Sequence, residues 1–156
     1  MALRVTQITP ILVRMGKIMR QVARESESDN QLLFLPGVFN ETLALLFDAH
    51  QYFQARGIED QSSLRGRNRN NYSTEMSRVT MRLTSVMAWI MVRRAIHAGR
   101  IDEGKAASDY RLDGREICLD DGMLDDMPYY LTYLSDRSRD LYARVDRLDR
   151  LAYGHC

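Results

Sequence analysis

The stretch SVMAWIMVRRAIHAG, Ser85 to Gly99, constrains the fold of this chain more than any other part of its sequence. Seven consecutive apolar residues, Val86 to Val92, run directly into Arg93 and Arg94. A helix that crosses a bilayer needs about 20 apolar residues, so this run is too short to span a membrane. A helix that is apolar on every side must therefore be covered by protein on more than one side. The sequence predicts a helix that lies between other helices.

Composition favours an all-α fold. The chain has 156 residues, enough for one domain with its own core, and only 3 prolines and 9 glycines. Its 22 basic and 21 acidic residues nearly cancel, so its overall charge does not point to nucleic acid or to an acidic membrane. Cys118 and Cys156 form no C-x-x-C motif and follow no secretory signal, so we expect no disulfide, no metal or other cofactor, and a cytoplasmic location.

Apolar spacing predicts an antiparallel bundle of three long helices in a domain over residues 36–156. The first helix is expected from Pro36 or Asn40 to Gly57. The second is expected from an N-cap at Asn71 or Ser73 to Ala98, and the third from Met127 to Ala152. A short helix is expected from Asp102 to Tyr110. The predicted core stripes are Phe39, Leu43, Leu46, His50 and Phe53; then Met76, Val79, Leu83, Val86 and Ile90; then Met127, Leu131, Leu134, Ser138, Leu141, Val145 and Leu148.

Residues 1–35 are predicted to be a basic extension with a polar linker. Residues 1–24 contain five basic residues and no acidic one, and their apolar residues have helical spacing. This pattern is typical of an amphipathic helix that packs on its own domain, or of an arm that docks on a membrane surface or a partner.

The second helix offers a candidate dimer interface. Its apolar surface is wider than a three-helix bundle covers, because a second row of side chains accompanies the core stripe. The candidate interface residues are Met87, Trp89, Met91 and Val92.

The connections between the helices carry opposite charge. The first connection is basic and the second, from Asp102 to Asp126, has nine acidic and three basic residues. In an up-down-up bundle these connections lie at opposite ends, which suits two different partners. The candidate docking residues are Arg65, Arg67, Arg69, Asp120, Asp121, Asp125 and Asp126. On the third helix, Asp140 with Arg144 and Asp146 with Arg150 are expected to be solvated pairs without a site.

The sequence contains no recognisable catalytic or metal-binding set. The histidines His50, His97 and His155 lie far apart, and Cys118 follows an apolar residue as a buried thiol would. The run LDDGMLDD lacks the oxygen spacing of an EF-hand, and no phosphate-binding glycine motif occurs. We therefore expect a protein that is not an enzyme.

Three blocks in order, YSTEMSRVTMRLTSVMAWIMVRRAIHAGRI, YRLDGREICLDD and SRDLYARVDRLDRL, resemble the RcdA family of alphaproteobacterial proteins, named for regulating degradation of CtrA. The resemblance covers about Val38 to Leu151. It implies a three-helix bundle that forms a homodimer and acts as an adaptor without enzymatic activity. Its implied partners are the ClpX unfoldase with the ClpP protease, response-regulator-type adaptors and substrates such as a CtrA-type regulator, with recruitment to a cell pole.

Two other functions remain open on the residues alone. The first is a small ligand-binding or regulatory module whose pocket is formed by Trp89, the methionines and His50. The second is a DNA-associated regulator that uses Arg65 to Arg69, although the lack of interleaved aromatic residues argues against nucleic-acid binding.

Overall fold

The computed structural model describes residues 34–122 and 124–154. The predicted basic helix within residues 1–24, and His155 and Cys156, lie outside the described residues. The chain divides into two units, residues 1–37 and 38–156, and apart from residues 34–37 all the described residues belong to the second. The predicted all-α bundle is confirmed, since every regular element of the described residues is a helix. None of the described helices is long and apolar enough to span a membrane.

The first long helix extends further than the sequence indicated. Residues 34–52 are helical, and the helix continues through a π-helical turn, η2 (Phe53–Gly57), into α2 (Ile58–Ser63). Gly57 does not end the helix but is buried in it, and the Tyr72 hydroxyl lies 3.2 Å from its carbonyl oxygen. A Cβ at Gly57 would lie 3.4 Å from the Tyr72 hydroxyl, an ordinary van der Waals contact.

The prediction of the inward face of this helix was wrong. The buried side chains are those of Val38, Thr42, Leu45, Ala49 and Tyr52. The predicted stripe lies one residue further along, a rotation of about 100° around the helix. Two of its members are exposed, Leu43 by 51% of its surface and also His50.

Helix α3 (Arg67–His97) begins earlier than predicted. It starts after Gly66, whose φ of 57° favours glycine, rather than at Asn71 or Ser73. Its core stripe is confirmed for Val79, Leu83, Val86 and Ile90, which are at most 1% exposed.

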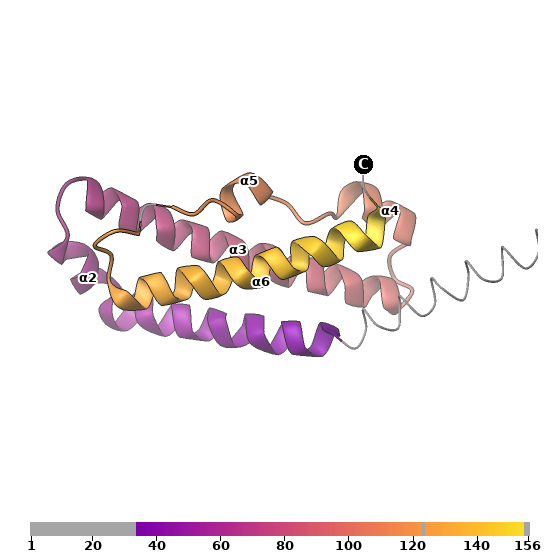
Figure 1. Cartoon of the computed structure of the whole chain (residues 1–156). Coiled ribbons are helices and arrows are strands. Elements are labelled where there is room, and N and C mark those ends of the chain that lie inside the picture. The colour runs from indigo at the N-terminus through magenta and orange to yellow at the C-terminus, as the bar shows by residue number, and fades with distance from the viewer. Residues whose placement is uncertain (1–33, 123, 155–156) are drawn as a thin grey trace, which may run out of the picture. The chain divides into compact units, whose positions relative to one another are not determined.

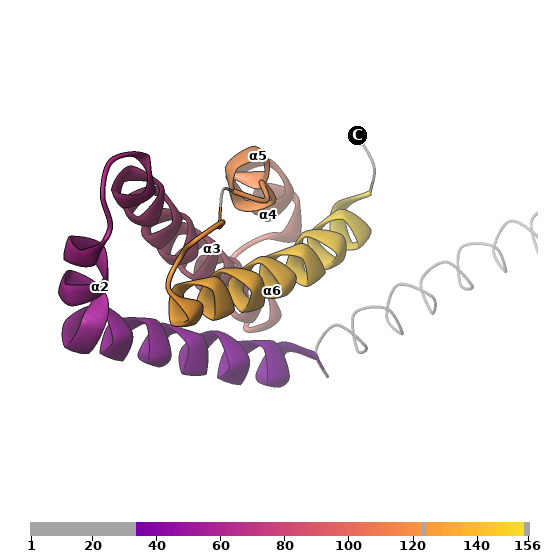
Figure 2. The same cartoon turned by 60° about the vertical axis from the view of Figure 1, so that its left-hand side comes forward.

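The chain between α3 and the last helix, residues 98–128, contains two short helices, and we call it the return segment. The short helix predicted from Asp102 to Tyr110 is α4 (Glu103–Asp109), and the Asp102 carboxylate caps it by accepting a hydrogen bond from the Lys105 amide at 3.1 Å. Helix α5 (Arg115–Cys118) follows within the acidic stretch. Both short helices lie on the side of the α3–α6 pair away from the first helix (Figures 1 and 2).

Helix α6 (Tyr129–Tyr153) starts just after Pro128, two residues later than predicted. Its core stripe is confirmed at Leu131, Leu134, Ser138, Leu141 and Val145, each at most 1% exposed. Along this stripe α6 packs lengthwise on α3.

The direction of α6 differs from the antiparallel prediction. Residues later in α3 contact residues later in α6. The hydrogen-bonded pairs are Glu75 with Ser135, Trp89 with Asp149 and Arg93 with Tyr153. The two helices are therefore parallel, and the return segment runs back along them before α6 begins (Figure 1). The first helix is antiparallel to both, since Glu41 pairs with Arg144 while Tyr52 packs against Tyr130.

Candidate interaction surfaces

A buried ion pair fastens the return segment to the long helices. Arg82 is fully buried and donates to Glu75 Oε1 at 2.9 Å, to the Cys118 carbonyl at 2.7 Å and to the Asp120 carbonyl at 3.2 Å. The Ser135 hydroxyl donates to the same Glu75 oxygen. A buried ion pair is tolerated when further hydrogen bonds satisfy both partners, as here. Arg82 thereby joins α3, α6 and the return segment.

Two further polar side chains of α6 hold the return segment. The buried Asp149 carboxylate accepts from Trp89 Nε1 at 2.9 Å and from Arg111 Nε at 2.8 Å. The Tyr142 hydroxyl donates to the Asp113 carbonyl at 2.6 Å. Burial raises the pKa of Tyr142, so its hydroxyl keeps the proton that it donates.

These polar groups serve the fold in the described part of the chain. No group of three or more His, Cys, Asp or Glu side chains among the described residues is placed to hold a metal ion. Cys118 is fully buried, and burial raises the pKa of its thiol, which disfavours the reactive thiolate. Contacts with other molecules are therefore expected at the surface of the described residues.

An apolar strip, which we call the apolar seam, runs along the first helix and α3. Arg94 stacks on the Phe39 ring at 4.1 Å, and Phe53 lines a groove with Thr80 and Thr84. Helical spacing between these two contacts places Leu43 and Leu46 alongside Met91 and Met87. The seam consists of Phe39, Leu43, Leu46, Phe53, Met81, Met87 and Met91.

The seam is accessible to a partner. Leu43 is 51% exposed, Met91 55% and Met81 38%. Phe47, 60% exposed, lies one turn from Leu43 on the same helix. Adjacent exposed apolar side chains of this kind are typical of protein interaction sites.

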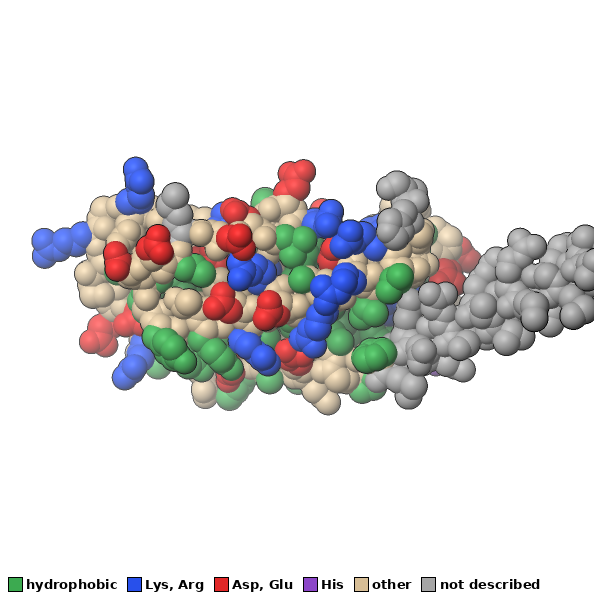
Figure 3. Space-filling view, viewed as in Figure 1, with side chains coloured by type: hydrophobic (Ala, Val, Ile, Leu, Met, Phe, Trp, Pro, Cys, Tyr) green, Lys and Arg blue, Asp and Glu red, His purple; other side chains and the backbone are tan. Residues whose placement is uncertain are grey.

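A second candidate surface is a groove of about 480 Å³ lined by tyrosines where α6 begins. Tyr129 is 83% exposed, and the Tyr130 ring lies 5.1 Å from that of Tyr52 and 5.6 Å from that of Tyr133. The Tyr52 hydroxyl donates to Asp60 at 2.7 Å, across the π-helical turn. Hydrophobic side chains gather at this junction of α6 and the first helix (Figure 3). The groove was not predicted from the sequence, although PYYLTY lies at its edge, because its tyrosines lie outside the core stripe of α6.

The predicted dimer residues separate into two groups. Met87 and Met91 lie in the seam, whereas the half-buried Val92 lines a groove beside the return segment with Tyr110. Trp89 is only 4% exposed and bonds Asp149, so the structure places it in the core of its own chain. The alternative pocket of Trp89 with His50 is not formed, since His50 is exposed on the first helix.

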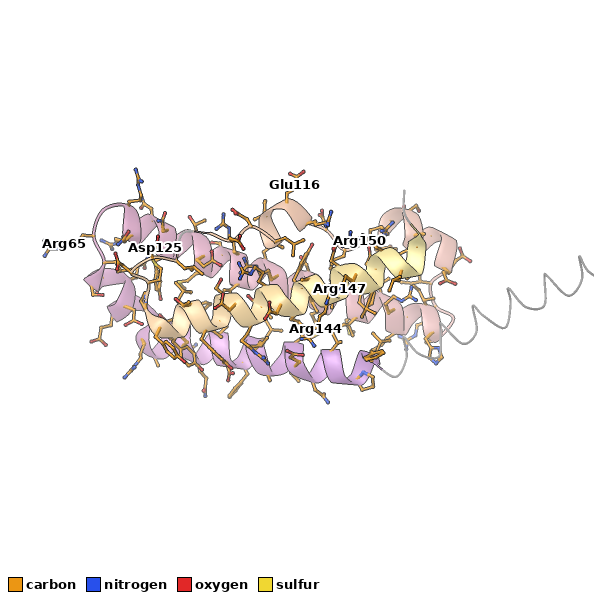
Figure 4. The ribbon with its side chains drawn as sticks, viewed as in Figure 1. Arg65, Glu116, Asp125, Arg144, Arg147 and Arg150 are labelled. Carbon is orange, nitrogen blue, oxygen red and sulfur yellow. The ribbon has the colours of Figure 1, made fainter. Side chains whose placement is uncertain are left out.

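The predicted docking residues occupy different positions from those expected. Arg67 and Arg69 lie in the first turns of α3, so of the three arginines only Arg65 lies on the connection between helices. Asp120 pairs with Arg78, and Asp121 with Arg139. Arg65 and Asp125 lie at the same end of the bundle, because α6 is parallel to α3 (Figure 4). The prediction that each end carries one sign of charge was wrong.

The sequence model of a family described as "Protein of unknown function (DUF1465)" matches residues 27–155. The chain belongs to this family. Comparison with curated proteins gave no match.

Among solved structures, this DUF1465 protein is similar to RcdA from Caulobacter crescentus CB15. The TM-score is 0.64 at 28% sequence identity, and the match covers 79% of this chain and 93% of RcdA. The predicted resemblance to the RcdA family is confirmed.

Proposed function

We propose that this protein is an adaptor without enzymatic activity in regulated proteolysis, which helps present substrates such as a CtrA-type transcription regulator to the ClpXP protease. The observation that carries the proposal is the similarity to RcdA, which extends over most of both chains. An adaptor of this kind works by binding other proteins. The exposed apolar seam and the tyrosine groove offer two separate surfaces for such binding.

The proposal includes homodimerisation through the apolar seam. Leu43 and Met91 are each more than half exposed in the single chain, on neighbouring helices. A twofold dimer buries the same patch on both copies, so one apolar strip is sufficient for it. The buried face of the first helix separates the tyrosine groove from the seam, so the groove stays open for a different protein. Tyrosines are enriched in protein–protein interfaces.

A reconstituted degradation assay tests the proposal. Purified ClpX, ClpP, a response-regulator-type adaptor and a CtrA-type substrate are mixed with and without this protein, and substrate loss is followed over time. We expect faster degradation when the protein is present. A Tyr129→Ala/Tyr130→Ala variant, matched against Ile58→Ala at another exposed apolar position, tests the groove. An unchanged degradation rate upon addition of the wild-type protein contradicts the adaptor function.

A further inference from the structure

Arginines on one face of α6 form a continuous surface that we call the basic band. Its members have exposed or partly exposed side chains, one on α5 and four on α6: Arg115, Arg137, Arg144, Arg147 and Arg150. Lys and Arg side chains cross α6 in a diagonal row from the first helix toward α5 (Figure 3), and Arg144, Arg147 and Arg150 follow one another along the helix (Figure 4).

The ion pairs of the band leave its outer surface positive. Arg137 and Arg144 share one carboxylate, that of Glu41, at 3.3 and 2.6 Å. Arg115 and Arg150 likewise share Asp146, at 3.2 and 2.7 Å. The pairing predicted between Asp140 and Arg144 is not formed, and the Asp146–Arg150 pair is not solvated as predicted, since the Asp146 side chain is only 7% exposed.

The two carboxylates that pair with the band, those of Glu41 and Asp146, are less exposed than their arginine partners. The Glu41 side chain is 24% exposed, whereas those of Arg137 and Arg144 are 51% and 45% exposed. The Arg115 side chain over Asp146 is 55% exposed. A partner that approaches this face therefore meets guanidinium groups first.

Arg147 has no partner among the described residues. It lines a groove of about 520 Å³ between α6 and the first helix, together with Glu41, Arg137, Asp140 and Arg144. The other four arginines of α6 all bond a carboxylate. Even with the exposed Asp140 counted, five arginines of the band face three carboxylates, so positive charge is in excess.

We propose that the basic band binds an acidic, extended segment of a partner protein. The guanidinium fork matches a carboxylate with two parallel hydrogen bonds, and Glu41 shows that this groove already holds one carboxylate between two arginines. From Arg137 to Arg150 the helix rises by roughly 20 Å, the length of about six extended residues. The inference deepens the proposed function, on which it rests, by naming the chemistry of one partner.

An acidic protein segment fits the band better than nucleic acid does. The groove lining contains no aromatic side chain on which a base would stack. The chain as a whole carries a formal charge of only +1.

A peptide-binding assay tests the inference. A fluorescent peptide of about eight alternating Glu and Asp residues is titrated with the full-length protein, against a peptide with Gln and Asn in their place. Arg147→Glu, which breaks no ion pair, and Arg144→Glu/Arg147→Glu are compared with Arg65→Glu/Arg69→Glu, a matched charge change outside the band. Inorganic phosphate and a single-stranded DNA oligonucleotide are separate competitors.

We expect the acidic peptide to bind, with an affinity that falls as salt rises, and the band double variant to weaken binding by about tenfold or more. The matched control should change it by less than about twofold. Absence of acidic-peptide binding, equal losses in both double variants, or tighter binding of DNA than of peptide overturns the inference. The peptide assay contains no protease, so it tests the band independently of the degradation assay. Peptide binding together with an unchanged degradation rate would contradict the adaptor function but not the inference about the band.

Discussion

Individual core residues should account for much of the stability of the α3–α6 pair. Leu134 is fully buried in the α6 stripe. Replacing it with Ala removes three heavy atoms and leaves a cavity, at a cost of about 2–5 kcal/mol in the free energy of unfolding. Chemical denaturation measures this loss. Leu151→Ala, at a position 60% exposed, is the matched control and should cost less than about 0.5 kcal/mol. Equal losses would mean that Leu134 is not in the core.

The thiol of Cys118 should make stability depend on alkaline pH. Burial raises its pKa in the folded chain, so the unfolded chain loses the proton at lower pH. The resulting contribution to stability is complete below the ordinary thiol pKa and is lost as pH rises through the raised folded value. The pKa values of Tyr52, Tyr72 and Tyr142 are also raised, so these tyrosines also make the folded chain less stable at alkaline pH. The contribution of Cys118 is therefore obtained from the difference in unfolding free energy between proteins with and without the thiol.

This pH effect is measured in a Cys156→Ser background, with and without Cys118→Ala. We expect the difference in unfolding free energy between the two proteins to be constant near neutrality and to shift against Cys118 above about pH 9. A difference that stays the same up to pH ~11 would show that the thiol ionises equally in both states.

At the scale of elements, the attachment of the return segment rests on single polar contacts. Tyr142→Phe removes the hydrogen bond to the Asp113 carbonyl and should cost about 1–3 kcal/mol, because a part-buried acceptor loses its donor. Amide hydrogen exchange should become faster around residues 111–118 and stay unchanged in the middle of α3. Tyr133→Phe, at a side chain 38% exposed, is the control. Uniformly faster exchange in all helices would contradict a local anchoring role.

Helix positions and the α6 core face could be predicted from the sequence, but the inward face of the first helix could not. Apolar side chains of that helix lie on two adjacent stripes, one through Val38 and Leu45 and one through Phe39 and Leu46. The buried stripe contains Thr42, whose hydroxyl bonds the Val38 carbonyl at 2.6 Å and so is satisfied without water. Hydrophobicity alone favours the other stripe, which instead forms the apolar seam.

At the scale of the whole molecule, the predicted antiparallel direction of α6 was wrong, because helix lengths and apolar spacing do not fix the path of the chain between two helices. The 31 residues of α3 rise by about 46 Å, and an extended chain of residues 98–128 is more than long enough to return over that distance. What decides the path is a few buried polar groups, Arg82, Tyr142 and Asp149, whose partners are mostly backbone carbonyls or distant side chains. The spacing of apolar residues does not reveal such contacts. The prediction that opposite charges lie at opposite ends of the bundle assumed an antiparallel α6, and so it was wrong together with that direction.

The apolar seam leads to the last prediction, which concerns assembly. If two copies pair through the seam, charges placed at Leu43 and Met91 lose water when the interface forms. We expect Leu43→Glu/Met91→Glu to raise the dimer dissociation constant by about 100-fold or more, because buried unpaired carboxylates cost several kcal/mol. Both positions are more than half exposed in the single chain, so the helicity and thermal midpoint of the monomer should change little.

Sedimentation velocity at tens of micromolar protein measures this change. Tyr129→Glu, at a position 83% exposed and outside the seam, is the matched control and should remain dimeric. A wild-type protein that sediments only as a monomer contradicts the dimer itself. A dimer that survives the seam variant but dissociates with Tyr129→Glu would instead place the interface at the tyrosine groove. In that case the carboxylate at position 129, and not those at positions 43 and 91, would be buried when the dimer forms.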